Sequence, residues 1–463
     1  MLRLATAFLL WHLMRAVLWT VLILLVLFAV FAAWASRPAI HPIEAPVASG
    51  FDPAEVARGA NLAALGNCNN CHTAPGGRSF AGGRAVPTPF GIVYSTNITP
   101  DLMTGIGQWS EAAFQRAMRE GIDRDGDHLY PAFPYDHFTM LSDADSRALY
   151  AYFMTREAVR ARPPDNVLPF PLNVRDVVAA WKALYFRSRR FQPNPAHDAV
   201  WNRGAYLVEG VSHCGACHTP RNPLGAEKKT RALAGGEVQG WNAYALDRNS
   251  PAPVPWKAQS LFRYLRHGWH PEHGVARGPM SEVTMNLGKV EESDVRAIAT
   301  YVAWQMRAPD ERAAAASSND SAEAPPAAPN EHHSGHGTAE AAISATPDGS
   351  HALGASIYLS SCEYCHNGTR PLPYGGIDFK FSTALNAPSP RNVVNVTLHG
   401  LHPPEGTRGS IMPGFDGAIG DDELEALLIY LRAEFTAEPP WRDIPKDITA
   451  ARKAVHEEGD SWP

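Results

Sequence analysis

The sequence is poor in cysteine, and no cysteine is left over for a structural bridge. Only six cysteines occur among 463 residues, and all six belong to three copies of one motif, Cys-x-x-Cys-His. Because every cysteine is used in this way, none is left outside the motifs for a disulfide or for a separate zinc knuckle.

The sequence also lacks an excess of either charge. Its 41 basic and 47 acidic residues give a formal net charge of −6 and an isoelectric point of about 6.3. This balance does not favour a nucleic acid partner. Outside the three motifs there is no Rossmann glycine pattern and no candidate acid–base pair, so the sequence predicts no catalytic residue.

The three motifs have the spacing of c-type haem attachment sites. Cysteines three positions apart lie on one face of a helix, where both thiols reach the two vinyl groups of one porphyrin. The histidine that follows presents its imidazole to the iron as an axial ligand. The attachment pairs are Cys68 and Cys71, Cys214 and Cys217, and Cys362 and Cys365, and the axial histidines are His72, His218 and His366.

A single Cys-x-x-Cys could instead hold zinc or act as a redox dithiol. Three copies that consume every cysteine favour three covalently bound haem c groups. The first cysteines lie at 68, 214 and 362, at intervals of 146 and 148 residues, which indicates three tandem domains. We therefore expect a mostly α fold of three class I-like cytochrome c domains with an N-terminal transmembrane helix.

The composition suggests where these domains begin and end. The segment 308–350 is rich in Ala, Ser, Pro, Asn and His and has almost no aromatic residues, so it cannot bury a core. The expected parts are a membrane anchor or signal at 1–37, haem domains at 50–156, 197–307 and 351–436, a packed connector at 157–196, a disordered linker at 308–350 and a polar C-terminal tail at 437–463.

The N-terminal segment predicts export across a membrane. Residues 16–35 carry no charge, and Arg3 and Arg15 precede them. About 20 apolar residues span a bilayer, and the positive flank places the N-terminus in the cytoplasm. The small residues around Trp34 also fit a signal-peptide cleavage site, but the apolar run exceeds the roughly 7–15 residues of a signal. We favour a retained anchor in the bacterial inner membrane, with the haem domains on the periplasmic side.

A second axial ligand is predicted from the internal repeat. Each domain has a helix that ends at a glycine: Gly121, Gly268 and Gly400. Twelve residues further on stand Phe133, Met280 and Met412. Methionine sulfur is a common sixth ligand in cytochromes c, so Met280 and Met412 are the predicted ligands. Phe133 cannot bind iron, so the first haem is either five-coordinate or uses Met140, with His137 and His128 as alternatives.

The chain resembles the three-haem cytochrome c subunit of bacterial membrane-bound dehydrogenases, which act on alcohols, gluconate, aldehydes or N-heteroaromatics such as nicotinate. The resemblance rests on residues 94–101 (YSTNITPD), 104–107 (TGIG), 129–135 (LYPAFPY), 201–210 (WNRGAYLVEG), 214–222 (CGACHTPRN) and 278–280 (GPM). It is close over residues 50–306. The third domain matches mainly at its haem motif and Met412.

The resemblance implies an electron-transfer subunit, which is not itself the substrate-oxidising subunit. Such a chain receives electrons from a separate catalytic subunit and passes them haem to haem to ubiquinone or a terminal oxidase. The catalytic partner carries pyrroloquinoline quinone, flavin, or a molybdopterin with an iron–sulfur subunit. Residues 134–139 (PYDHFT) are most similar to the versions that accompany molybdopterin enzymes.

Two alternatives remain open at this point. The chain could be a stand-alone haem oxidoreductase that binds substrate at an open first haem, since Phe133 leaves that iron without the expected methionine. It could also be the cytochrome c subunit of a terminal oxidase complex.

Overall fold

The computed structural model describes residues 2–308, 312, 349–368, 370, 375–402 and 410–458. The expected linker at 308–350, with His332, His333 and His336, lies almost wholly outside the described residues. The chain forms two units, which we describe separately: residues 1–60 with 71–190, and residues 61–70 with 191–463.

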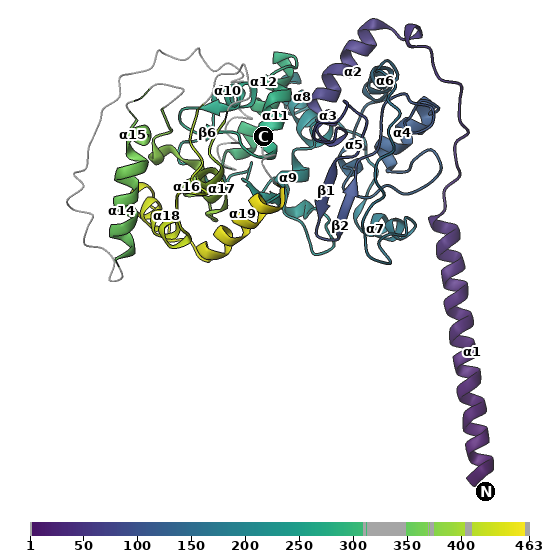
Figure 1. Ribbon diagram of the computed structural model, residues 1–463. Coiled ribbons are helices and arrows are strands. Elements are labelled where there is room, and N and C mark those ends of the chain that lie inside the picture. Colours follow the sequence, from purple (N-terminus) through teal and green to yellow (C-terminus); the bar gives the residue numbers. More distant parts are fainter. Residues whose placement is uncertain are drawn as a thin grey trace. The chain divides into compact units, whose positions relative to one another are not determined.

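Helices predominate in the first unit, and one small hairpin is added to them (Figure 1). Its elements are α1 (Leu2–Ala35), β1 (Ala85–Thr88), β2 (Gly91–Tyr94), α4 (Glu111–Glu120), α5 (Tyr135–Phe138), α6 (Asp143–Met154) and α7 (Val177–Tyr185). The chain passes between the units at three points: within α2 (Pro53–Leu65), within α3 (Cys68–Cys71), and after Arg190.

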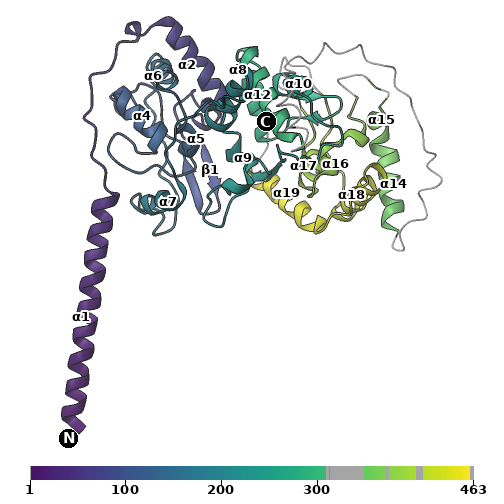
Figure 2. The same ribbon diagram turned by 180° about the vertical axis from the view of Figure 1, so that it is seen from behind.

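The elements of the second unit fall into two halves. Its first half contains α8 (Ala199–Tyr206), α9 (Gly215–His218), β3 (Gly236–Val238), β4 (Trp241–Ala243), α10 (Ala258–His267), β5 (Trp269–His270), β6 (Gly274–Val275), α11 (Pro279–Leu287) and α12 (Glu292–Met306). Its second half contains α14 (Ser350–Ser361), α15 (Glu363–His366), α16 (Thr383–Asn386), α17 (Arg391–His399), α18 (Asp421–Phe435) and α19 (Ile444–Glu458). Figure 2 shows α8 and α10 beside α12.

One helix crossing occurs three times. In each repeat a glycine of the helix before the haem motif packs against the closing helix. A methyl group on Gly59 would lie 1.9 Å from the Ala148 carbonyl oxygen and 2.6 Å from the Cβ of Tyr152. One on Gly204 would lie 2.0 Å from the Ala297 carbonyl oxygen and 2.7 Å from the Cβ of Tyr301. One on Gly354 would lie 2.2 Å from the Ala426 carbonyl oxygen and 2.7 Å from the Cβ of Tyr430. Only a glycine permits two helices to approach this closely.

An ion pair flanks the crossing in the first two repeats. Arg58 pairs with Asp145 at 2.7 Å, and Arg203 pairs with Asp294 at 2.8 Å. The third repeat has Leu353 and Glu423 at these positions, and the Glu423 carboxylate instead accepts a hydrogen bond from the Gly420 N–H at 2.8 Å. The helix crossing is therefore common to all three repeats, whereas the ion pair beside it occurs in the first two.

An apolar helix lies where the sequence predicts the membrane anchor. Within the described residues, Trp11–Ala35 is long and apolar enough to cross a bilayer. Its end is packed onto the first unit: the Ala35 carbonyl accepts a hydrogen bond from Nε2 of His128 at 2.8 Å, and Lys182 contacts Nδ1 of the same ring at 3.1 Å. The last residue of the helix, Ala35, is thus hydrogen-bonded to the folded part of this unit.

Aromatic side chains of the segment 157–196 pack on their neighbours. This segment contains α7, and the rings of Trp181 and Phe186 lie 6.5 and 5.3 Å from the ring of buried Tyr135. Farther along, Phe191 packs on Tyr206 at 5.4 Å within the second unit.

The segment expected to be a polar tail differs from that expectation. Through residue 458 it forms α19, which lies beside α17 and α18 (Figures 1 and 2). Trp441, Ile444, Ile448 and Ala451 are buried in the same core as the closing helix. The mostly polar composition hides this apolar stripe, whose members are three and four residues apart.

We predict that Gly204→Ala destabilises the second unit by roughly 2 kcal/mol or more, because the new methyl group overlaps the Ala297 carbonyl. An alanine normally stabilises a helix relative to glycine, so the expected sign is opposite to that of helix propensity. Chemical unfolding followed by circular dichroism measures the effect. Gly417→Ala is the control, since its methyl group would meet nothing within 4 Å. Equal stability of both variants would contradict the close crossing.

Candidate haem sites

Each predicted axial histidine is oriented by a backbone hydrogen bond. Nδ1 of His72 lies 2.6 Å from the Thr96 carbonyl oxygen, Nδ1 of His218 lies 2.6 Å from that of Tyr244, and Nδ1 of His366 lies 3.0 Å from that of Ile377. In each pair Nδ1 is the donor, because a carbonyl oxygen only accepts. The lone pair then belongs to Nε2, which is the atom that would bind iron.

The three imidazoles are held in the form that binds a metal. Burial lowers the pKa of His72, His218 and His366, against an opposing effect of the backbone hydrogen bonds. A lowered pKa keeps each ring neutral at physiological pH, and only a neutral imidazole has a lone pair to offer.

The loop after each motif folds back on the motif through a glycine. The N–H of Gly82 donates to the His72 carbonyl at 2.8 Å, that of Gly235 donates to the His218 carbonyl at 2.9 Å, and that of Gly376 donates to the Cys365 carbonyl at 2.8 Å. In the first two repeats a two-stranded hairpin follows. The hairpin delivers the carbonyl that receives Nδ1.

The second and third predicted sites share one cavity. A cavity of about 600 Å³ in the second unit is lined by both motifs and both predicted methionines. Its lining includes Cys214, Cys217, His218 and Met280 from one site, and Cys362, Cys365, His366 and Met412 from the other. All six cysteines lie within the described residues, and they are thiols that form no disulfide. The structure therefore brings together the two complete predicted ligand sets.

Both methionines are positioned by a glycine that the fold requires. Gly278, with φ +56°, precedes Met280 in the chain, and a methyl group on it would lie 2.5 Å from the Trp241 indole. A methyl group on Gly400, which has φ +70°, would lie 2.4 Å from the Met412 carbonyl oxygen. Residues 401 and 412 form a β-bridge. Gly121, Gly268 and Gly400 each end a helix, as predicted.

An amide clasp joins the two halves of this cavity. The Asn242 N–H donates to Oδ1 of Asn392 at 2.8 Å, and Nδ2 of Asn392 donates to the Asn242 carbonyl at 2.9 Å. Nδ2 of Asn395 donates to the Gly240 carbonyl at 3.0 Å, and Arg391 forms an ion pair with Glu237. Thus α17 pairs with the β3–β4 hairpin, and specific contacts fix the distance between the two sites.

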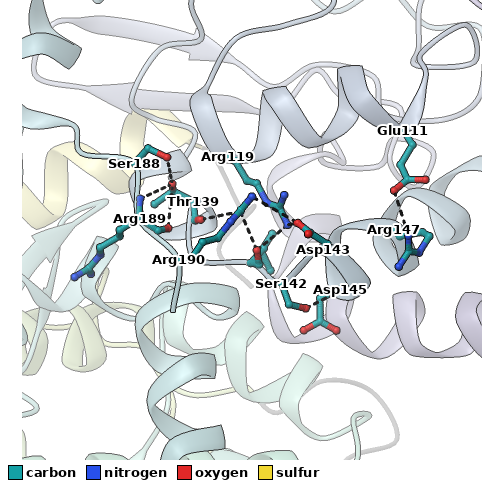
Figure 3. Close-up of polar contacts among 11 residues, drawn as sticks. Glu111, Arg119, Thr139, Ser142, Asp143, Asp145, Arg147, Ser188, Arg189 and Arg190 are labelled. Carbon is teal, nitrogen blue, oxygen red and sulfur yellow. Dashed lines mark hydrogen bonds and ion pairs between the residues drawn. The ribbon is translucent and has the colours of Figure 1, made fainter. Parts of the chain in front are cut away.

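In the first unit, Met140 is held in a rigid segment. Arg119 donates to the Leu141 carbonyl at 2.8 Å, and Arg190 donates to the Thr139 and Leu141 carbonyls at 3.3 and 3.2 Å. Both guanidinium groups also face Asp143 (Figure 3), at 2.6 and 3.5 Å. Met140 is 2% exposed. The clamp fixes its backbone, as a ligand position would require.

The other candidate ligands of the first site differ in whether their side chains are already engaged. Both ring nitrogens of His128 are engaged, with Ala35 and Lys182, so His128 is not available to iron in this conformation. His137 is buried in α5 and stays the alternative to Met140. Phe133 packs against Phe138 at 5.3 Å, as part of an aromatic cluster.

Several features of the sites escaped the sequence analysis. The clasp around Asn392 consists of ordinary polar residues with no motif. The β5–β6 turn places His273 on the cavity wall, although nothing in the local sequence distinguishes this histidine from its neighbours.

Comparison with known proteins gives one consistent result. A nicotinate dehydrogenase subunit of Pseudomonas putida is 41% identical over 420 residues, which cover 90% of this chain and 33% of that protein. The chain thus spans about a third of the length of this relative. Gluconate 2-dehydrogenase cytochrome c subunit of Pantoea cypripedii is 34% identical over 86% of this chain and 89% of that protein. Fructose dehydrogenase cytochrome subunit of Gluconobacter japonicus is 32% identical over 85% and 82%.

A shorter relative covers part of the chain. A dihaem cytochrome c-type protein of Cereibacter sphaeroides is 35% identical over 54% of this chain and 85% of that protein. No family model matched the sequence.

We predict that Gly376→Ala disturbs the third site alone. A methyl group there would lie 2.5 Å from Cε1 and Nδ1 of the His366 ring, so the imidazole must turn away from its carbonyl partner. The expected result is a change in the absorption and spin state of one of the haems. The control is again Gly417→Ala. Unchanged spectra in a Gly376→Ala protein with full haem content would contradict the assigned orientation of His366.

Proposed function

Because the chain belongs to the family of bacterial dehydrogenase cytochrome c subunits, we propose that it carries three covalent haems and relays electrons between them. The cofactor common to this family is covalently bound haem c. Haem supplies one-electron exchange between ferric and ferrous iron. The protein holds the haems, sets their surroundings and fixes their spacing.

The residues present fit this cofactor. Each motif combines two thiols with a neutral imidazole whose Nε2 is the available donor. We assign Met280 and Met412 as the sixth ligands of the second and third haems, and Met140, with His137 as the alternative, as that of the first. Thioether ligation raises the reduction potential, as a high-potential relay requires.

The single observation that carries the proposal is the cavity with two ligand sets. Two haems held in one cavity, between walls joined by the Asn242–Asn392 clasp, need no intervening solvent layer. Direct electron exchange between the second and third haems follows from this arrangement.

We further propose a periplasmic dehydrogenase as electron donor and ubiquinone or a terminal oxidase as acceptor. The 41% identity to a nicotinate dehydrogenase subunit supports a donor of the molybdopterin type with an iron–sulfur subunit, in preference to a quinoprotein or flavoprotein. The apolar helix Trp11–Ala35 supports an anchor in the inner membrane, which keeps the relay close to membrane quinone.

Purification of the intact complex in mild detergent tests the donor. Molybdenum and a [2Fe–2S] signal in the complex would support the proposed partner. Bound pyrroloquinoline quinone or flavin would instead identify the donor as a quinoprotein or flavoprotein dehydrogenase. A chain that purifies alone and whose haem reacts with peroxide would contradict the subunit role.

We predict that Met280→Ala and Met412→Ala each lower the reduction potential of one haem, since a thioether ligand favours ferrous iron. Spectroelectrochemical titration measures the potentials. Electron transfer through the chain should slow in both variants.

Met285→Ala is the matched control. Met285 lies in the same helix as Met280 but is 43% exposed, so its removal should leave all potentials unchanged. Normal potentials in Met280→Ala and Met412→Ala would show that the assigned ligands are wrong.

A further inference from the structure

Beyond the predicted ligands, the shared cavity has an unusual histidine on its wall. His273 is 6% exposed, and among the described residues neither of its ring nitrogens has a hydrogen-bond partner. The hydroxyls of Ser250 and Thr383, which also line the cavity, are buried without a partner in the same part of the structure. A buried polar group left unsatisfied costs about 1–3 kcal/mol. These atoms therefore indicate a polar group that belongs in the cavity.

The imidazole of His273 is held in a fixed orientation. Its ring stacks on the Trp256 indole with a centroid separation of 3.4 Å and an angle of 12°, and Trp256 in turn packs edge-on against Tyr264 at 5.3 Å. Stacking covers one face of the imidazole and leaves its nitrogen-bearing edges for hydrogen bonding. Burial, with a smaller effect of His270, lowers the pKa of His273 to about 3. The neutral ring carries one N–H donor and one acceptor.

His273 stands where the two predicted sites meet. It precedes Met280 of the second site by seven residues. A methyl group on the adjacent Gly274 would lie 3.7 Å from Cδ1 of Ile377, and the Ile377 carbonyl orients His366 of the third site. Residues of both predicted sites thus lie close to this short segment.

The cavity wall offers one cationic side chain to an anionic partner. Among its described lining residues, Arg277 is the one lysine or arginine, and Glu423 is the one aspartate or glutamate. The Glu423 carboxylate accepts the Gly420 N–H, whereas Arg277 donates to the Gly400 carbonyl at 3.3 Å on the cavity wall. Each haem brings two propionate carboxylates, which need donors and positive charge when they leave water.

We propose that His273 donates a hydrogen bond to a haem propionate in the shared cavity and thereby raises the potential of that haem. The assignment rests on the proposed haem relay. A donor on the propionate draws negative charge away from the porphyrin and stabilises ferrous iron relative to ferric iron. His273 acts through the propionate and is a positioning residue, not an iron ligand.

The test replaces His273 in the full-length, haem-loaded protein. His273→Phe keeps an aromatic ring for stacking on Trp256 and removes both nitrogens, whereas His273→Gln retains an N–H donor. The expected result is a fall in the potential of one haem in His273→Phe, with recovery toward the original value in His273→Gln. The propionate bending band in the resonance Raman spectrum should shift in the His273→Phe protein.

His270→Phe is the matched control. His270 lies in the same hairpin, is equally buried at 7% exposure, and accepts the Glu272 N–H at 3.2 Å. It does not line the cavity, so its replacement should leave the potentials unchanged. Repeating His273→Phe in the Met280→Ala and Met412→Ala backgrounds identifies which haem holds the propionate.

The haem content is measured first, so that a failure of the proposed relay can be told apart from a failure of the proposed role of His273. Fewer than three haems in the unaltered protein would overturn the proposed relay. Three haems with unchanged potentials in His273→Phe would overturn the role of His273 alone. Equal potentials in the Phe and Gln variants would also overturn it, because the donor would then have no effect.

Discussion

The close crossing of two helices is the constraint on which each predicted haem site depends. The haem motif follows the first helix of a repeat, and the predicted distal methionine precedes the last helix. The two ligand positions face each other only if these helices meet. Gly59, Gly204 and Gly354 allow the contact, since any side chain there would overlap a backbone carbonyl of the partner helix.

A second constraint connects two of the sites. The β3–β4 hairpin of the second repeat contributes both to the site of His218 and to the clasp with α17, whose terminal glycine positions Met412. Because one set of hydrogen bonds shapes both walls of the cavity, the spacing of its two sites is fixed by structure and not by the length of the chain between them. A relay needs such fixed spacing, because electron transfer is sensitive to distance.

Much of this organisation could be predicted from the sequence, because covalent chemistry restricts it. The Cys-x-x-Cys-His motifs and the helix-ending glycines Gly121, Gly268 and Gly400 depend on local rules of spacing and backbone conformation. The dehydrogenase subunit family, expected from the resemblance, was confirmed by the relatives.

Features that depend on contacts between distant segments were not predictable. The apolar stripe of α19 is too sparse to stand out in a polar segment, yet Ile448 is 1% exposed in the folded chain. The Asn242–Asn392 pair joins residues 150 positions apart, and neither residue belongs to a motif. His273 is distinguished only by the cavity it lines, which exists after three segments have packed together.

The most direct test of the account is the mass of the intact, mature chain after haem attachment. Three covalent haems are expected, and replacement of the cysteine pair in any one motif by alanine should remove one haem and leave the other two. A chain that carries two haems or fewer, or in which loss of one motif leaves the haem count unchanged, would contradict the central claim that each motif holds its own haem.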